Sequence, residues 1–337
     1  MCRGCGHARN RCVTFRRRPF LPSVADPMTK PDIEIIATGL HFPEGPVELP
    51  DGSIAVVEIG RGRIVRIRDG GKQEVVAVTN GGPNGMALGP DGALYVCNNG
   101  GFSWVEEGGW LRPVGLAPGY SGGAIQKVNV STGEVMTLYD QCDGRTLSGP
   151  NDIVFDNHGG FYFTDTGRVR EFQRDHGGVF YAKADGSSIK RVVFPLLTPN
   201  GVGLSPDLDT LYVAEMETAR LWSYAIVEPG VVEKRPFPSQ GGGVLVIGLG
   251  GFQRFDSLKV TASGNICVAT LVTGCITVVS PRGDLLDQVW MPDIYPTNLG
   301  FAGQDLQDAI VTLSLTGQIG RLRWPEKGLR LQHQGGG

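Results

Sequence analysis

The sequence predicts an all-β fold, a single six-bladed β-propeller with a metal ion in its central channel. Three observations support the propeller: a strand pattern that recurs six times, a high content of turn residues, and the lack of any long helical hydrophobic period. The 337 residues include 51 glycines and 22 prolines. Such a content is typical of many short strands joined by tight turns.

The repeat begins near residue 43 and continues almost to the C-terminal end. Each copy has a short apolar strand, a turn that often contains Asp-Gly or a related pair, and a second strand rich in aromatic and β-branched residues. The six copies read GPVELPDGSIAVVEI, NGMALGPDGALYVCN, NDIVFDNHGGFYFTD, NGVGLSPDLDTLYVA, DSLKVTASGNICVAT and NLGFAGQDLQDAIVTLS. A third strand usually follows, and a fourth is visible in several copies. Because such a sheet cannot bury two apolar faces alone, six blades are expected to stack in a ring.

The propeller is expected to span residues 32–325. An open ring would leave unpaired strand edges, so the segment DIEIIATG at 32–39 is expected to complete the last blade as its outer strand. Residues 326–337 are expected to form a flexible tail. Residues 1–27 contain six arginines, one acid and three cysteines, without the apolar core of a signal peptide. We expect this leader to be a disordered extension, or the product of an upstream start codon with Met28 as the true first residue.

Composition narrows the range of partners. The formal net charge of −3 gives no reason to expect a nucleic acid or an anionic membrane as partner. No run approaches the roughly 18 apolar residues of a membrane-spanning helix. The four cysteines after the leader fall mostly in apolar strand patterns and are expected to be buried free thiols, which suits a reducing cytoplasm. The oligomeric state is not indicated.

The spacing between copies points to one large insertion. Equivalent positions lie 40, 67, 49, 56 and 41 residues apart, and the greatest excess is the Gly-rich segment 100–123 in the second blade. This segment contains Trp104, Trp110 and Tyr120, an unusual aromatic content for a solvated linker. A lid whose rings contact a substrate is one interpretation. The other is that the rings pack on the blade's own surface.

A ring of oxygen-bearing side chains is predicted at the central axis. The residues that open the innermost strands, in blade order, are Glu44, Asn84, Asn151, Asn200, Asp256 and Thr297. Equivalent positions converge in a propeller, so carboxylates and amide carbonyls would meet, and hard divalent cations take these ligands. Two carboxylates in a narrow channel would also repel each other unless a cation or a shared proton compensates them. Taken singly, each Pro-Asn-Gly is an ordinary turn signal.

These motifs resemble the regucalcin/gluconolactonase family. The resemblance rests on PEGP near the start, GPNDIVFDNHGGFYFTDTG in the third blade, TPNGVGLSPDLDTLYVAE in the fourth and FDSLKV in the fifth, and it covers roughly residues 32–325. The family consists of six-bladed propellers that hydrolyse sugar and other lactones with calcium or a similar divalent ion. The resemblance implies that Glu44, Asn151, Asn200 and Asp256 hold the metal. Calcium is expected first, and magnesium, manganese or zinc are compatible alternatives.

Further residues are assigned around this ring. Asn84 is expected to contact the site through water or to bind substrate, and Asp152 to support the Asn151 amide from behind. The sequence departs from the sugar-lactonase members at Gly149, where they have an arginine two residues before the third-blade Asn. Arg145 is the candidate substitute, and its other interpretation is an ordinary surface arginine.

The expected activity is metal-dependent hydrolysis of a small lactone, with Asp256 as general base or as nucleophile beside the ion. One alternative is a phosphotriesterase-like hydrolase or a metal-free condensation catalyst on a related propeller. The other alternative is a non-catalytic propeller in which the ion only stiffens the channel and the loops bind a ligand.

Overall fold

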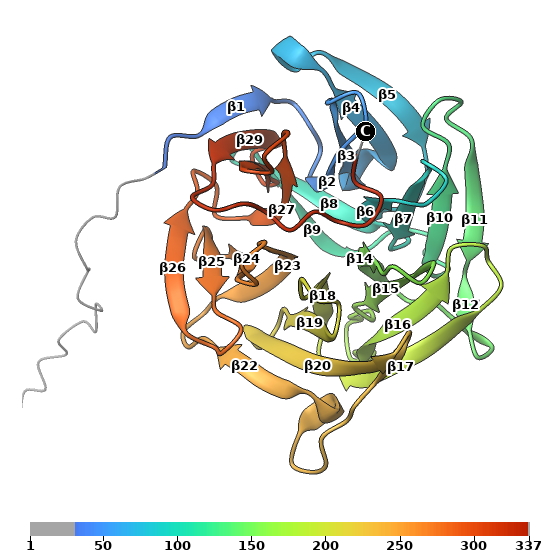
Figure 1. Ribbon diagram of the computed structural model, residues 1–337. Helices are drawn as coiled ribbons and strands as arrows, with labels where there is room; N and C mark the ends of the chain where they lie inside the picture. Colours follow the sequence, from blue (N-terminus) through green and yellow to red (C-terminus); the bar gives the residue numbers. More distant parts are fainter. Residues whose placement is uncertain (1–30, 336–337) are drawn as a thin grey trace, which may run out of the picture. The chain divides into compact units, whose positions relative to one another are not determined.

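Six antiparallel sheets of four or five strands surround a central channel as blades, and two further two-stranded sheets are small hairpins (Figure 1). The computed structural model describes residues 31–335, so the prediction for the leader at 1–27 lies outside the described residues. The described part has no α-helix, only three short 3₁₀ turns: η1 (Ile59–Arg61), η2 (Asp69–Gly71) and η3 (Gln240–Gly242). The six-bladed propeller is therefore confirmed.

The first three blades follow one another in chain order. Blade 1 consists of β2 (Pro43–Glu48), β3 (Ile54–Glu58), β4 (Arg63–Ile67) and β5 (Gln73–Val78). Blade 2 consists of β6 (Pro83–Leu88), β7 (Leu94–Asn98), β10 (Ala124–Val128) and β11 (Val135–Tyr139), with the hairpin β8 (Phe102–Glu107) and β9 (Trp110–Leu116) inserted. Blade 3 consists of β14 (Pro150–Phe155), β15 (Gly160–Asp165), β16 (Gly177–Lys183) and β17 (Ile189–Leu196), preceded by the small hairpin β12 (Gln141–Cys142) and β13 (Arg145–Thr146).

The last three blades repeat the arrangement. Blade 4 consists of β18 (Pro199–Leu204), β19 (Thr210–Glu215), β20 (Arg220–Glu228) and β22 (Val244–Gly248), with the short β21 (Val231–Val232) also paired to β20. Blade 5 consists of β23 (Arg254–Val260), β24 (Ile266–Leu271), β25 (Cys275–Val279) and β26 (Leu285–Trp290). Blade 6 consists of β27 (Pro296–Ala302), β28 (Asp308–Leu313), β29 (Gln318–Arg323) and β1 (Glu34–Ala37).

The N-terminal strand closes the ring. β1 pairs antiparallel with β29 and so forms the outer strand of blade 6, as the sequence predicted. This pairing joins the first described strand to the last one and covers the edge that β29 would otherwise expose.

The core consists of six hydrophobic clusters, one at each seam between neighbouring blades. The period-2 alternation of the strands explains this division. In β3, Ala55 and Val57 belong to the cluster shared with blade 2, whereas Val56 belongs to the cluster shared with blade 6. All four cysteines of the described residues are free and buried, as predicted. Within residues 31–335, no helix has the length and apolar character that crossing a membrane requires.

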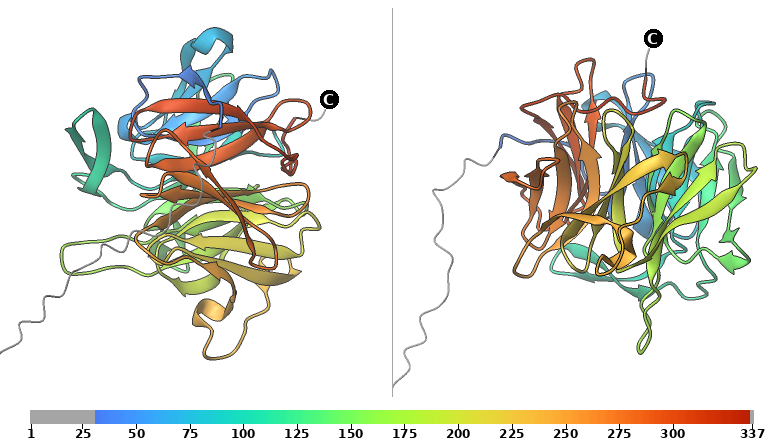
Figure 2. Two further views of the ribbon diagram at one scale, coloured as in Figure 1. Left: turned by 90° about the vertical axis from the view of Figure 1, so that its left-hand side faces the viewer. Right: turned by 60° about the horizontal axis from the view of Figure 1, so that its bottom comes forward.

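The two ends of the channel are covered by different segments, and Figure 2 (left) shows them on opposite faces of the propeller. The β8–β9 hairpin extends from blade 2 toward blades 1 and 6, where the Leu111 amide donates to the Leu315 carbonyl at 3.2 Å. The Trp104 ring lies 5.2 Å from the ring of Phe42, just before β2.

The C-terminal segment crosses the other end of the channel (Figure 1). The Leu329 amide donates to Val260 at the end of β23, and the Gln334 side chain donates to the Phe301 carbonyl. Two small cavities, of about 20 and 40 Å³, lie between this segment and the ends of the innermost strands. Residues 326–337 were predicted to form a flexible tail, and the described part of this segment, up to residue 335, makes these defined contacts.

Candidate metal centre

The predicted ring residues stand near the start of the six innermost strands. Each is the second residue of its strand, except in blade 5, where it is the third. All six side chains are buried: Glu44, Asn84, Asn151, Asn200, Asp256 and Thr297. They lie at the end of the channel that faces the β8–β9 hairpin, because each innermost strand begins there and ends beside the C-terminal segment.

A bulge follows or includes the ring position in every innermost strand. The pairing register shifts after Glu44 in β2, across Asn151 in β14 and across Asn200 in β18. A register shift also spans the ring position in β6, β23 and β27. A bulge breaks strict alternation, so two consecutive side chains can face the same side of a strand. This geometry brings Asp152 as well as Asn151 toward the channel.

Glycine follows the ring residue in blades 1, 2 and 4, and neighbouring strands explain why. A Cβ at Gly45 would lie 2.6 Å from the carbonyl oxygen of Asn84, and one at Gly201 would lie 2.5 Å from the backbone nitrogen of Leu258. The innermost strands thus approach closely at the level of the ring. Larger residues at this position occur only in blades 3, 5 and 6, where Asp152, Ser257 and Asn298 stand.

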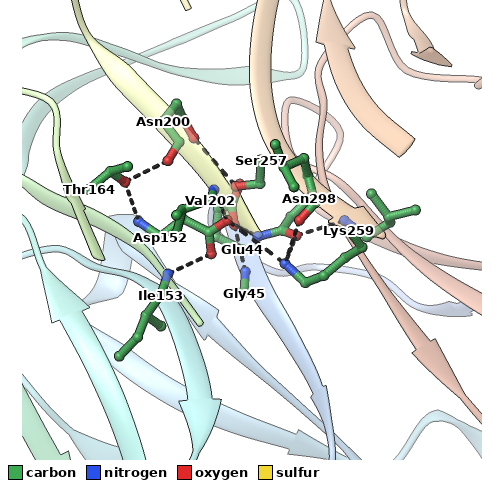
Figure 3. A network of polar contacts seen from close by, with 12 residues as sticks. Glu44, Gly45, Asp152, Ile153, Thr164, Asn200, Val202, Ser257, Lys259 and Asn298 are labelled. Atoms are coloured by element: carbon green, nitrogen blue, oxygen red, sulfur yellow. Dashed lines mark hydrogen bonds and ion pairs between the residues drawn. The ribbon is translucent and has the colours of Figure 1, made fainter. Parts of the chain in front are cut away.

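These three side chains link neighbouring blades (Figure 3). Asn298 Nδ2 donates to Glu44 Oε2 at 2.7 Å, and Ser257 Oγ donates to Asn200 Oδ1 at 3.4 Å. The Asp152 carboxylate accepts from the backbone amides of Ile153 and Val202. Asn298 and Ser257 thus hold the side chains of Glu44 and Asn200 from an adjacent blade, whereas Asp152 bonds to backbone.

Burial and mutual repulsion oppose ionisation of the ring carboxylates. Loss of solvation raises the pKa of Glu44 to about 7, although bonds from Asn298 and the Gly45 amide favour its charged form. Burial first, and then the nearby charge of Glu44, raise the pKa of Asp256 well above its ordinary value. Burial likewise raises the pKa of Asp152, and Lys259 opposes that shift.

Lys259 is the cation nearest these acids in the channel. Its Nζ lies 3.8 Å from Asp152 Oδ2 and 3.3 Å from Asn298 Oδ1 (Figure 3). Three buried carboxylates, those of Glu44, Asp152 and Asp256, therefore face one ammonium group. When all four are ionised, an excess of two negative charges remains, which one divalent cation would balance.

The residues present fit such a cation. Asn151 Oδ1 is buried without a hydrogen-bond partner among the described residues, although buried amide oxygens normally have one. Two carboxylates with amide oxygens form a donor set suited to a hard dication. Within residues 31–335, no group of three His, Cys, Asp or Glu side chains could hold a metal ion.

Comparison with known proteins identifies the family. The model described as the SMP-30/gluconolactonase/LRE-like region matches residues 42–314, most of the chain. The chain belongs to this family. A gluconolactonase of Zymomonas mobilis is 27% identical over 295 residues, which cover 80% of this chain and 74% of the relative. The lactonase drp35 of Staphylococcus saprophyticus is 30% identical over 275 residues, which cover 81% and 75%.

A solved structure shows the same fold. The calcium-binding protein regucalcin of Agrobacterium tumefaciens matches 89% of this chain and 98% of its own, with a TM-score of 0.67 and 16% identity. This likeness supports the propeller architecture of the SMP-30/gluconolactonase member described here.

A buried arginine, Arg168, lies beside Gly149. A Cβ at Gly149 would lie 2.7 Å from Nη1 of Arg168, which follows β15. Arg168 is 5% exposed, and burial lowers the pKa of its guanidinium. Stacking on aromatic rings contributes about 1–2 kcal/mol, whereas removing an ion from water costs several kcal/mol. The rings of Phe102 and Tyr120 therefore offset only part of this cost.

The remaining predicted residues lie in different places. Trp104 packs with Phe42 and Phe102, Tyr120 donates from its hydroxyl to the Ser148 carbonyl, and Trp110 is 46% exposed. Their role in substrate binding stays a prediction, as does that of Asn84. Arg145, an exposed residue of β13, lines a separate cavity of about 480 Å³ with His176 and Arg191.

Two assignments from sequence change in detail. Asp152 bonds to the backbone of Ile153 and Val202, and no bond to the Asn151 amide is found among the described residues. Thr297, in the sixth ring position, bonds to the hydroxyls of Thr312 and Ser314, while its neighbour Asn298 reaches Glu44. Sequence reasoning missed Asn298 because it compared one position per copy, and it missed Lys259 and Arg168 because neither belongs to the repeated motif.

Proposed function

We propose that the protein hydrolyses the ester bond of a small lactone with a divalent cation, calcium first, held by Glu44, Asn151, Asn200 and Asp256. The main support is a buried, electrostatically incomplete set of carboxylates and amides at the channel mouth of a family member. Two relatives named gluconolactonase and lactonase, and a fold neighbour named for calcium binding, support the same proposal.

The chemistry divides between the cation and the chain. When bound, the cation polarises the lactone carbonyl and stabilises the negative charge that develops on its oxygen. Glu44, Asn151 and Asn200 hold that cation in place. The bulges, together with Asn298 and Ser257 from adjacent blades, orient the Glu44 and Asn200 side chains before substrate arrives.

Asp256 is the proposed general base. Its carboxylate accepts a proton from water as the water oxygen forms a bond to the carbonyl carbon. The ring C–O bond then breaks, the departing alkoxide takes the proton, and the product is an open-chain hydroxy acid. If Asp256 instead attacks the carbonyl carbon directly, the ring oxygen leaves as an alkoxide that takes up a proton, and Asp256 and the acyl group form a mixed anhydride that water hydrolyses in a second step. In both routes one water is consumed, and no oxidant or reductant is required.

The substitution Asp256→Asn tests this role. We expect the variant to lose about 100-fold or more in kcat across a panel of γ- and δ-lactones, because the amide cannot accept the proton. The matched control is Asp284→Asn, an exposed carboxylate on blade 5. An Asp256→Asn protein that binds calcium by calorimetry yet turns over like wild type would contradict the assignment.

Chelation separates catalysis from a purely structural ion. Removal of the cation is expected to abolish lactone hydrolysis and lower the melting temperature, and calcium is expected to restore both. The same titration with magnesium, manganese and zinc ranks the ions. A chelator-sensitive melting temperature without any lactonase activity in the loaded protein would favour the non-catalytic alternative.

The four buried free thiols of the described residues support a cytoplasmic location, because thiols stay reduced in that compartment.

A further inference from the structure

Arg168 is a buried cation with two guanidinium nitrogens that lack a hydrogen-bond partner among the described residues. It lies on the loop after β15, at the end of the channel where Asn151 stands, because Asp165 at the end of β15 pairs with Pro150 at the start of β14. Its Nε and Nη2 atoms are buried and have no hydrogen-bond partner within residues 31–335. These two nitrogens form one edge of the guanidinium plane, the edge that binds a carboxylate in bidentate fashion.

The neighbouring carboxylate does not satisfy this edge. Asp165 accepts hydrogen bonds from the backbone amides of Ser148, Gly149 and Gly167, at 2.7, 2.7 and 2.9 Å. No ion pair joins Arg168 to an acid in the described part of the chain. An arginine with a structural role at this depth would normally have such a pair.

Gly149 leaves room for the guanidinium. A side chain there would collide with Nη1, so the lack of one places Arg168 against the backbone that leads to Asn151. Phe102 and Tyr120, from the insertion at 100–123, lie 5.0 and 5.3 Å from the guanidinium carbon. The cation is therefore held between the proposed metal centre and the insertion that covers the channel mouth.

We propose that Arg168 is a substrate-binding residue that receives a carboxylate group carried by the lactone. This inference rests on the proposed lactonase function and adds a substrate class to it: lactones with an acidic substituent beside the ring. A carboxylate supplies both the charge and the two acceptors that the free edge lacks, whereas a hydroxyl supplies neither the charge nor the second acceptor.

The insertion must shift for this contact to form, because Nε and Nη2 of Arg168 are buried in this structure. Both ends of the insertion contain glycines with positive φ, Gly100 and Gly101 before it and Gly119 and Gly122 after it. Outside these ends, the hairpin touches the body through few polar contacts, among them the Leu111 bond to Leu315. A substrate carboxylate would replace the aromatic cover at the guanidinium edge.

The test compares two lactones of equal ring size, γ-butyrolactone and its γ-carboxylate, with the calcium-loaded protein. The readout is selectivity, the ratio of kcat/KM for the carboxylate lactone to that for the neutral one. Arg168→Gln is expected to lower this ratio at least about tenfold, mainly through KM, and Arg168→Lys to retain part of it. Gly149→Ala, which pushes a methyl group into the guanidinium, is expected to lower the same ratio.

The control is Arg170→Gln, two residues away, where an exposed arginine pairs with Asp175. It is expected to leave selectivity unchanged. A structural role for Arg168 predicts a lower melting temperature and an equal loss on both lactones, and that result would overturn the proposal. Arg168→Gln should instead melt at or above the wild-type temperature, because it removes a buried charge without a partner.

A failure of the proposed function gives a different result. If the wild-type protein hydrolyses neither lactone, calorimetry with the ring-opened dicarboxylate, 2-hydroxyglutarate, tests Arg168 directly. Binding to the wild type that is lost in Arg168→Gln supports the carboxylate site without lactonase activity. No binding to the wild type, or equal binding to both proteins, overturns it.

Discussion

At the scale of single residues, the channel mouth concentrates negative charge that the protein alone does not neutralise. Glu44, Asp152 and Asp256 are buried together, with Lys259 as their nearby ammonium group. Backbone and amide donors stabilise the carboxylates in part. The remaining repulsion can be relieved by protons or by a dication, so protons and metal are expected to compete for the same site.

The metal-free protein should therefore lose stability as the pH rises. The folded state holds the pKa of Glu44 near 7, against 4.5 for the ordinary group, so the protonated form stabilises the fold fully below about pH 4.5. That contribution is lost as the pH rises through about 7, and it amounts to about 3 kcal/mol for Glu44. Urea melts with a chelator at pH 5 and pH 8 measure the difference.

A substitution at Glu44 and the addition of calcium test whether these carboxylates cause the pH dependence. Glu44→Gln, which cannot ionise, is expected to flatten the pH dependence of the chelated protein. Saturating calcium is expected to do the same in the wild type, because the cation replaces the protons. The chelated wild type could instead be equally stable at pH 5 and pH 8 and show the same pH dependence of unfolding free energy as Glu44→Gln. That result would show that these carboxylates do not interact as described.

At the scale of elements, the six innermost strands are shaped by bulges and by glycines at the ring level. The bulge turns a ring side chain and sometimes its neighbour toward the channel, and the glycine lets the next strand approach. The strand β18 shows both features, because its register shifts across Asn200 and its Gly201 faces the backbone of β23. The position of Asp256 thus depends on a residue in the adjacent blade.

Gly201→Ala is expected to destabilise the protein and weaken metal binding together. Its methyl group would lie 2.5 Å from Leu258 N and 2.7 Å from Asp256 O, so β23 must move away. A cost of about 1–3 kcal/mol is typical of such overpacking. Thermal melts and calcium calorimetry measure both effects. Gly115→Ala, which has open space around the new Cβ, is the control and should change neither.

At the scale of the whole molecule, the propeller depends on closure of the ring by β1. The outer strand of blade 6 comes from the N-terminal part of the chain, whereas its other three strands come from the C-terminal part. This closure links the two ends of the chain in one blade, so that every blade packs between two neighbours. The ring geometry at the metal centre requires that circle, because Glu44 of blade 1 is held by Asn298 of blade 6.

A variant that begins at Gly39 removes β1 and should melt at a lower temperature than one that begins at Pro31. It should also self-associate, because β29 then presents an unpaired edge. Calcium is expected to bind more weakly, since blades 6 and 1 are no longer joined by this strand. Scanning calorimetry and light scattering test these expectations, and equal melting temperatures for the two variants would contradict them.

The repeat itself determined the blade count, the closing strand and the level of the ring. Hydrophobic alternation and turn residues act locally, so they predict strands and hairpins directly. Equivalent positions of a closed repeat must also meet at its axis. For this reason Glu44, Asn151, Asn200 and Asp256 could be assigned to one channel end from spacing alone, while their binding of a metal stays a proposal.

Tertiary structure decided the contacts that cross the seams. The pairing of Asn298 with Glu44 spans 254 residues, and Lys259 reaches Asp152 from another blade. Bulges break the period of two, so no pattern in sequence shows that Asp152 faces the channel. The burial of Arg168 could not be predicted from the sequence either. It depends on the lack of a side chain at Gly149 and on the place where the insertion folds back. Local sequence patterns therefore determine the strands of each blade, whereas the packing of blades against one another determines which side chains meet at the site.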